Sequence, residues 1–423
     1  MTRVEDFRAE LIRLLDAADK KIPDEKLIDS LWFNFGGKFL CIPKTLGSSL
    51  LRAIRILRMK SSNMGNNVSD SALEHILKEF LIELKYDHDQ SKVKQEIDGH
   101  VVRLFDRLKG MKAKEFLFLV PIMNLQVAEE ISIGDSSFFN LDEKSLGIIE
   151  ERFSLKFRHA EESLTNAIND FVKFNETKAV ALVIVQAPDT TKAAELALEK
   201  AESCLNVLRL YGLDAPFVIR DDYKRRVLRT LPFVSLDKKY YHYRSEAIND
   251  VSSVPLLDSK TICELDKGGF TILNRLLSKK TDELTPMQED LLIAVMWLGN
   301  AVKDNQRNMK FVKAVMALES LLVPDGGQNK CNVIAKRYAS IACPLATDSE
   351  KKEVFLNVRS LYQTRSSIIH AGEFGVLEED LSQIMYWTMV IIQVMLPYAE
   401  KYQTLQELIN AELPVNDFLY EGL

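Results

Sequence analysis

The feature that most constrains the fold is a series of helical segments in the last third of the chain. Thr285-Pro286 places a helix-capping residue before a proline at the first helical position, where proline is favoured. Pro324-Asp325-Gly326-Gly327 and Pro344 interrupt the apolar periodicity further on, as helix-ending residues do. Five helices are therefore predicted, over 286–304, 307–323, 329–343, 348–371 and 377–402. A last short helix is predicted within 403–423, and region 283–423 reads as an all-helical bundle.

The preceding part of the chain divides into a helical region and a region with strands. Residues 1–113 are predicted to be helical, because Phe7, Leu11 and Leu14 recur with a helical period and similar segments follow. A turn is predicted over 32–38. Residues 114–270 alternate strands and helices. A strand over 115–122 that ends at the proline and a short strand pair over 126–139 around Gly134-Asp135 come first. A helix over 146–174, a strand over 178–185, a helix over 190–211 and an irregular stretch over 252–269 follow. This alternation predicts an α+β domain with a small mixed sheet, within a chain that is mainly helical.

Composition narrows the class of protein. The chain has 423 residues, 47% of them hydrophobic and 27% charged, as expected for a globular protein of two or three domains. Its N-terminus lacks an apolar segment behind basic residues, and no run approaches 18 uncharged apolar residues. Five cysteines fall at no paired spacing. We therefore expect a cytoplasmic protein with reduced thiols and no membrane partner.

Several signatures of cofactor chemistry are missing. The sequence contains neither G-x-x-x-x-G-K-[ST] nor G-x-G-x-x-G after a strand, so nucleotide-driven chemistry has no support. The six histidines lack zinc spacing, and no G-x-S-x-G elbow is present. We expect neither a cofactor nor a metal site.

One segment, 361–372, combines two groups suited to phosphodiester chemistry. Arg365 is protonated at any physiological pH and can hold a phosphate, whereas His370 can take and give a proton near neutrality. Ser366 and Tyr362 precede His370 by one and two helical turns on the same face, and Gly372 is placed to follow the helix end. The alternative is structural, because an arginine and a histidine on one helix are common.

Helix geometry restricts how the pair can act. Residues five apart lie about 140° apart around a straight helix, so one helix cannot easily aim both groups at one atom. Two copies of the segment, related by a dimer axis, can do so if each contributes one group to each reacting centre. A homodimer is therefore expected.

The surrounding segments resemble a known family. Phe311–Leu322 contains A-L-E-S-L-L, Ala335–Ala339 reads A-K-R-Y-A, and Val358–His370 contains L-Y-Q-T-R-S-S-I-I-H. This ordered set resembles the HEPN superfamily, in particular its ApeA-like branch, over about residues 285–402. The resemblance implies a helical bundle that dimerises and, in many members, cuts RNA without a metal. It matches Arg365 and His370 to the catalytic pair, Glu319 to a buried acid, and Ser366 to the polar position after the arginine.

The resemblance implies an endoribonuclease that generates a 2′,3′-cyclic phosphate. It also implies a role in anti-phage defence, as a toxin whose activity is switched on by a phage or cellular trigger. Many catalytic relatives carry Asn, Asp or His where this chain has Ser366. Other members only bind partners, and in that alternative Arg365 forms a structural ion pair with Glu319.

Charge is distributed unevenly along the chain. Region 283–423 contains 12 Lys+Arg and 18 Asp+Glu, so it accounts for the whole net charge of −6. If this region binds RNA, the attraction must come from a local positive charge that opposes the net charge. Elsewhere, Arg52, Arg55 and Arg58 form a basic stripe on a predicted helix. A denser basic run contains Arg225, Arg226 and Arg229. Either could contact RNA, which leaves an RNA-binding regulator open, or could be a solvated surface.

Overall fold

The computed structural model describes most of the chain. The described residues are 2–20, 30–35, 37–63, 68–86, 90–93, 95–123, 125–140, 147–148, 151, 179–211, 218–219, 233–235, 240–241, 256–304, 306–324, 329–371 and 375–412. The fold is α+β and mainly helical, as predicted. It groups into two compact units, the first comprising Met1–Leu117, Val185–Ala197 and Val234–Lys239, and the second the remainder. The three regions drawn from the sequence stay a prediction.

The first unit is built largely from helices around one apolar core. Its helices are α1 (Thr2–Ala17), α2 (Gly47–Asn63), α3 (Asp70–Tyr86), α4 (Gln90–Val93) and α5 (Ile97–Lys109), with a short 3-10 turn at Lys44–Leu46. Phe7, Leu11 and Leu14 are fully buried, which confirms the helical period predicted for α1.

A β-hairpin interrupts this helical region, contrary to the prediction. Strands β1 (Ser30–Phe35) and β2 (Lys38–Pro43) pair antiparallel, with Phe33 opposite Leu40. The predicted turn over 32–38 is therefore wrong, since most of it is strand. Gly37 adopts φ +79°, a conformation that glycine supplies without steric cost, and so allows the chain to reverse between the two strands.

The main sheet has the strand order β10-β9-β3-β7-β6-β5, with β8 paired to β3. Its strands are β3 (Lys114–Met123), β5 (Ile131–Ile133), β6 (Ser136–Asn140), β7 (Ala179–Ala187), β8 (Val218–Ile219), β9 (Phe233–Ser235) and β10 (Tyr240–Tyr241). Pairs β5–β6, β6–β7 and β3–β8 are antiparallel, and a separate parallel pair joins β4 (Gln126–Val127) to β11 (Leu256–Leu257). Strand β3 continues through Pro121 instead of ending there. Most of the helix predicted over 146–174 lies outside the described residues.

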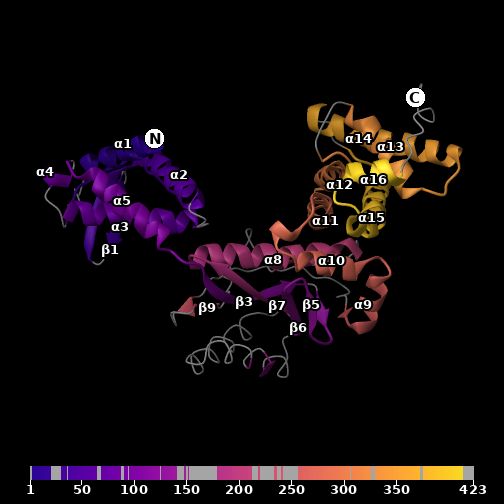
Figure 1. Ribbon diagram of the computed structural model, residues 1–423, viewed down its shortest axis with the longest axis horizontal. Coiled ribbons are helices and arrows are strands. Elements are labelled where there is room, and N and C mark those ends of the chain that lie inside the picture. Colours follow the sequence, from indigo (N-terminus) through magenta and orange to yellow (C-terminus); the bar gives the residue numbers. More distant parts are fainter. Residues whose placement is uncertain are drawn as a thin grey trace. The chain divides into compact units, whose positions relative to one another are not determined.

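Helix α8 (Thr190–Tyr211), predicted with these bounds, packs on the sheet in the second unit (Figure 1). Cys204 Sγ donates to the carbonyl oxygen of Ile133 at 3.1 Å, and Lys200 Nζ donates to that of Ile184 at 3.2 Å. These contacts anchor the helix to strands β5 and β7.

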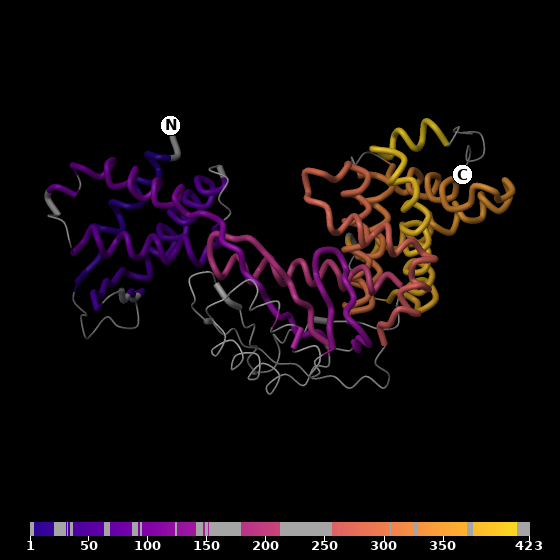
Figure 2. Tube along the Cα trace, turned by 60° about the horizontal axis from the view of Figure 1, so that its bottom comes forward, coloured from indigo at the N-terminus to yellow at the C-terminus, as the bar shows by residue number. Residues whose placement is uncertain are grey.

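The last third of the chain is a helical bundle, as predicted (Figure 2). Its helices are α11 (Pro286–Lys303), α12 (Arg307–Leu322), α13 (Lys330–Ala342), α14 (Asp348–Ala371), α15 (Glu378–Lys401) and α16 (Leu405–Glu412). Thr285 and Gln288 form a reciprocal capping box at the start of α11. Helices α9 (Ser259–Asp266) and α10 (Phe270–Leu277) precede the bundle, so the predicted irregular stretch over 252–269 is partly helical.

Helix α12 is the centre of this bundle, because it contacts α11, α13, α14 and α15. Eight of its residues are buried, a distribution that a helix surrounded on several sides requires. Helix α15 is the one helix in the described part of the chain that is long and apolar enough to cross a membrane by length and composition. Its packing against α11, α12 and α13 accounts for that composition, since Leu381, Ile384 and Ile391 lie in the core.

A close polar contact joins α8 to α11. Arg209 is fully buried and donates to Glu202 Oε1 at 2.7 Å and to Asn206 Oδ1 at 2.5 Å, while Lys303 of α11 donates to the same Glu202 oxygen at 2.8 Å. A Cβ added at Gly299 would lie 2.3 Å from Asn206 Oδ1. The helices can therefore approach this closely only with glycine at 299.

We expect Gly299→Ala to destabilise the protein by about 1–3 kcal/mol, the usual cost of forcing extra atoms into a packed contact. Gly99→Ala in α5 is the matched control, because a Cβ there meets nothing within 4 Å and alanine favours a helix. Denaturant unfolding monitored by circular dichroism measures both. Equal stability of the two variants would contradict the close approach.

The ion pairs of Glu202 with Arg209 and Lys303 should also make the free energy of unfolding depend on pH. Burial raises the pKa of Glu202, but Arg209 and Lys303 outweigh burial and hold that pKa below its ordinary 4.5. The stabilisation is therefore complete above the unfolded pKa and lost as pH falls through the folded value. We expect Glu202→Gln to lower the free energy of unfolding at pH 7, with the deficit shrinking as pH falls from 7 to below the ordinary glutamate pKa of 4.5. A deficit that is constant over this range would contradict the assignment.

Candidate functional site

Helix α14 carries the candidate residues on a face that continues its core stripe. Phe355, Val358 and Leu361 are buried at helical spacing and pack into the bundle. Tyr362 and Arg365 follow on the same side, one turn nearer the end of the helix. Arg365 therefore lies on the face of α14 that carries apolar side chains in the preceding turns. Its charge needs a partner at this partly buried position.

Glu319 of α12 provides that partner. Arg365 Nη2 lies 3.4 Å from Glu319 Oε1, and the Tyr362 hydroxyl donates to the same oxygen at 2.5 Å. The guanidinium carbon lies 5.8 Å from the centroid of the Tyr362 ring. The side chains of Arg365 and Glu319 are 20% and 16% exposed. The structure thus brings together three of the residues singled out in the sequence, although Glu319 precedes Tyr362 and Arg365 by more than 40 positions.

The surroundings fix the protonation of the phenol. Burial raises the pKa of Tyr362, the hydrogen bond to Glu319 and the charge of that carboxylate raise it further, and Arg365 lowers it only in part. Tyr362 therefore remains a hydrogen-bond donor at physiological pH. It holds Glu319 toward Arg365 and is unsuited to act as a base.

One donor of Arg365 remains open. Its Nε atom is buried and makes no hydrogen bond within the described part of the chain. A buried donor without an acceptor costs free energy, and this cost is carried by the folded bundle. The guanidinium is consequently oriented by Glu319 but not saturated by it.

Cys331 of α13 lies at the edge of this group. Its Sγ contacts the carbonyl oxygen of Arg359 at 3.5 Å. Burial raises the pKa of the Cys331 thiol, and the positive charge of Arg359 offsets this only partly. The thiol is therefore protonated near neutrality, which makes it a poor nucleophile.

Position 370 lies in the last turn of α14, as predicted. The described structure covers the backbone of His370 but not its side chain. Gly372, which was predicted to follow the helix end, lies outside the described residues. Ser366 is partly buried on the same helix. No break separates Arg365 from His370, so the angle of about 140° expected for positions five apart on one helix applies.

The basic stripe of α2 is partly neutralised within the first unit. Arg52 Nε lies 2.9 Å from Glu10 Oε1, and Arg58 pairs with Asp70, whereas Arg55 is exposed. These ion pairs leave less positive charge for a phosphate backbone than the sequence implies. Arg225, Arg226 and Arg229 lie outside the described residues.

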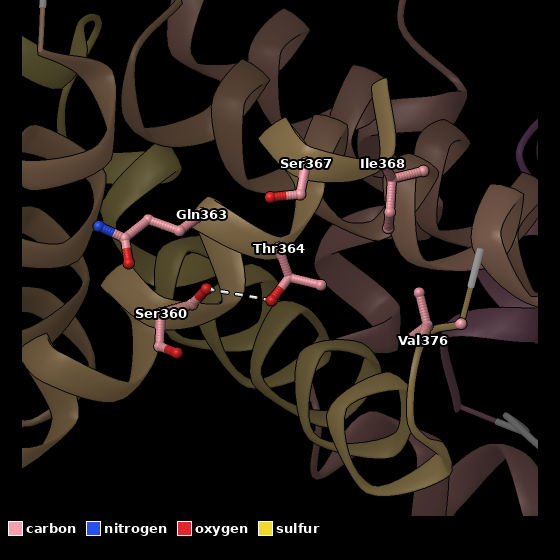
Figure 3. Close-up of a pocket in the computed structure, with 7 residues that line it drawn as sticks. Ser360, Gln363, Thr364, Ser367, Ile368 and Val376 are labelled. Atoms are coloured by element: carbon pink, nitrogen blue, oxygen red, sulfur yellow. Dashed lines mark hydrogen bonds between the residues drawn. The ribbon is translucent and has the colours of Figure 1, made fainter. Parts of the chain in front are cut away.

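A polar cavity of about 470 Å³ lies along α14, and sequence reasoning did not identify it (Figure 3). Its wall includes Ser360, Gln363, Thr364, Ser367, Ile368 and Val376. The signal available in the sequence is the spacing of Ser360, Gln363 and Ser367, which puts three polar residues on one helical stripe. That signal is weak, because the same spacing is ordinary for an exposed helix face.

Within the described residues, no group of three or more His, Cys, Asp or Glu side chains is close enough to hold a metal ion. No protein-family model matches the sequence, and comparisons with curated proteins and with solved structures find no significant match.

We expect Tyr362→Phe to lower the free energy of unfolding by about 1–2 kcal/mol, because it removes a hydrogen bond to a charged acceptor while keeping the ring. Tyr386→Phe on α15 is the control, since that side chain is 55% exposed and should tolerate the change. Chemical denaturation measures both variants. Indistinguishable effects would mean that the phenol does not hold Glu319.

Proposed function

We propose that this chain is a metal-independent endoribonuclease whose C-terminal bundle is the catalytic module. The observation that carries the proposal is the oriented guanidinium of Arg365. Glu319 and Tyr362 position it on α14, with its side chain 20% exposed, in the same unbroken helix as His370. The segments around this pair resemble the HEPN superfamily, where the matching positions cut RNA.

In the proposed reaction, His370 accepts the proton of a ribose 2′-hydroxyl. The 2′-oxygen forms a bond to the adjacent phosphorus as the bond from phosphorus to the 5′-oxygen breaks. The leaving 5′-oxygen takes a proton, which yields a 5′-hydroxyl beside a 2′,3′-cyclic phosphate. Arg365 stabilises the negative charge on the phosphoryl oxygens. A positioned general base contributes about 10²–10⁴-fold to such a step.

The angle between positions 365 and 370 favours a homodimer as the active form. Each reacting centre would then combine Arg365 of one copy with His370 of the other. In this proposal the chain is cytoplasmic, acts on RNA without a cofactor, and serves anti-phage defence as a toxin controlled by an infection signal. That biological role rests on resemblance to the family alone.

A second candidate function is a non-catalytic dimerisation or binding module. The ion pair between Arg365 and Glu319 favours it, because the arginine is already neutralised within its own chain. Under this alternative, both residues stabilise the bundle and His370 has no chemical role.

The test is incubation of the purified protein with total RNA in EDTA, followed by analysis of the product ends. We expect 2′,3′-cyclic phosphates from wild type and no cleavage from Arg365→Ala or His370→Ala. Two controls should retain activity: Arg307→Ala, which removes an exposed ion pair with Glu378, and His75→Ala, which changes an exposed histidine of α3. Wild-type function of the His370→Ala variant would favour the binding module, and cleavage of 2′-deoxy substrate would contradict the mechanism.

A further inference from the structure

The cavity along α14 has a composition that restricts its ligand. Four of its lining residues, Ser360, Gln363, Thr364 and Ser367, carry hydroxyl or amide groups, and none of the described lining residues is charged. A phosphate site would call for arginine, lysine or clustered backbone donors, and a cation site for carboxylates. The cavity instead suits a ligand that is neutral and rich in hydrogen-bonding groups.

The opposite part of the wall is apolar. In Figure 3, Ile368 and Val376 lie on one side of the cavity, whereas Gln363, Ser360 and Ser367 lie toward the other. An apolar surface facing polar groups fits a flat ring with a polar edge, as an unpaired nucleobase has. The volume of about 470 Å³ falls within the range of roughly 300–1,000 Å³ typical of small-ligand sites.

Several polar groups in the cavity are available. The Thr364 hydroxyl donates to the carbonyl oxygen of Ser360 at 3.3 Å and keeps its acceptor capacity. The side chains of Gln363 and Ser367 make no hydrogen bond to another described residue. A glutamine amide offers a donor and an acceptor side by side, the arrangement that reads the edge of a base.

Position 370 falls at the edge of the cavity that Gln363 forms. Position 370 follows Gln363 by seven residues, so the two lie within about 20° of each other around the helix. Arg365 lies about 160° from Gln363, toward the core and Glu319. A nucleotide held at this edge of the cavity would therefore be nearer the proposed base than the arginine of the same chain.

We propose that this cavity binds the nucleoside on the 5′ side of the scissile phosphate, whose 2′-hydroxyl is the nucleophile. The inference rests on the proposed function and adds a specificity determinant to it. Gln363 contacts the edge of the base, Ile368 and Val376 contact its face, and Ser367 binds a ribose hydroxyl. Arg365 of the second copy then meets the phosphate that follows.

Two measurements on the full-length chain test this assignment. The first is calorimetric titration of the His370→Ala protein with the four ribonucleosides and their 2′-deoxy counterparts. The second is the rate at which the wild-type His370 protein cleaves the 16 ribodinucleoside monophosphates. Both are repeated with Gln363→Leu and Ser367→Ala, and with Asn357→Ala, an exposed position on α14 outside the cavity, as the control.

We expect one ribonucleoside to bind more tightly than the others and the same base to be preferred 5′ of the cleaved bond. Gln363→Leu should reduce that preference by about fivefold or more, as the loss of a bidentate base contact does. Ser367→Ala should narrow the difference between ribonucleosides and deoxyribonucleosides, and Asn357→Ala should change neither quantity.

The two proposals fail in different ways. Nucleoside binding that depends on Gln363, without cleavage of any dinucleotide, would support the cavity assignment and contradict the nuclease. Cleavage that depends on Arg365 and His370, with base preference and nucleoside affinity unchanged in Gln363→Leu and Ser367→Ala, would overturn the cavity assignment and leave the nuclease standing.

Discussion

The pairing of Glu319 with Arg365 is the interaction on which the candidate site depends. An arginine on the core side of α14 is costly unless its charge is compensated, and a carboxylate from the central helix supplies that compensation. The same contact orients the guanidinium, with Tyr362 holding the shared oxygen from the other side. One ion pair both orients the guanidinium of Arg365 and neutralises its charge. The contact is therefore compatible with a catalytic arginine as well as with a structural one.

The position of α12 explains why this pairing forms. The helix is buried by four neighbours, so Glu319 is held at a fixed place relative to α14 instead of sampling the solvent. On the side of α14 away from Glu319, the described residues that line the open cavity are uncharged. Helix α14 thus separates a charged inner contact from a neutral outer site. This arrangement suits a substrate whose phosphate and base need different surroundings.

The helices of the bundle could be predicted from the sequence because their ends are marked locally. Thr285-Pro286 starts α11, and proline and glycine fall in the breaks that follow, so the predicted bounds agree closely with the observed ones. The hairpin β1–β2 was missed because its apolar residues also fit a helical region and its glycine turn was read as a simple break. Pairing between strands is a tertiary contact that local periodicity does not reveal.

The site was predictable only in part. Arg365, Tyr362 and Glu319 were singled out through a resemblance, and their contact joins helices that are adjacent only in the folded bundle. The cavity was not foreseen, since serine, threonine and glutamine on an exposed stripe give no distinctive pattern. Its wall is completed by Val376, which follows α14 and whose position depends on the packing of the bundle.

The most direct measurement of the central claim is complementation between two inactive variants. Arg365→Ala and His370→Ala proteins are mixed, allowed to exchange subunits, and assayed on RNA in EDTA. If each centre combines the arginine of one copy with the histidine of the other, one of the two centres in every mixed dimer is intact. About a quarter of wild-type activity should then return. A mixture that forms dimers yet stays as inactive as either variant alone would contradict the account.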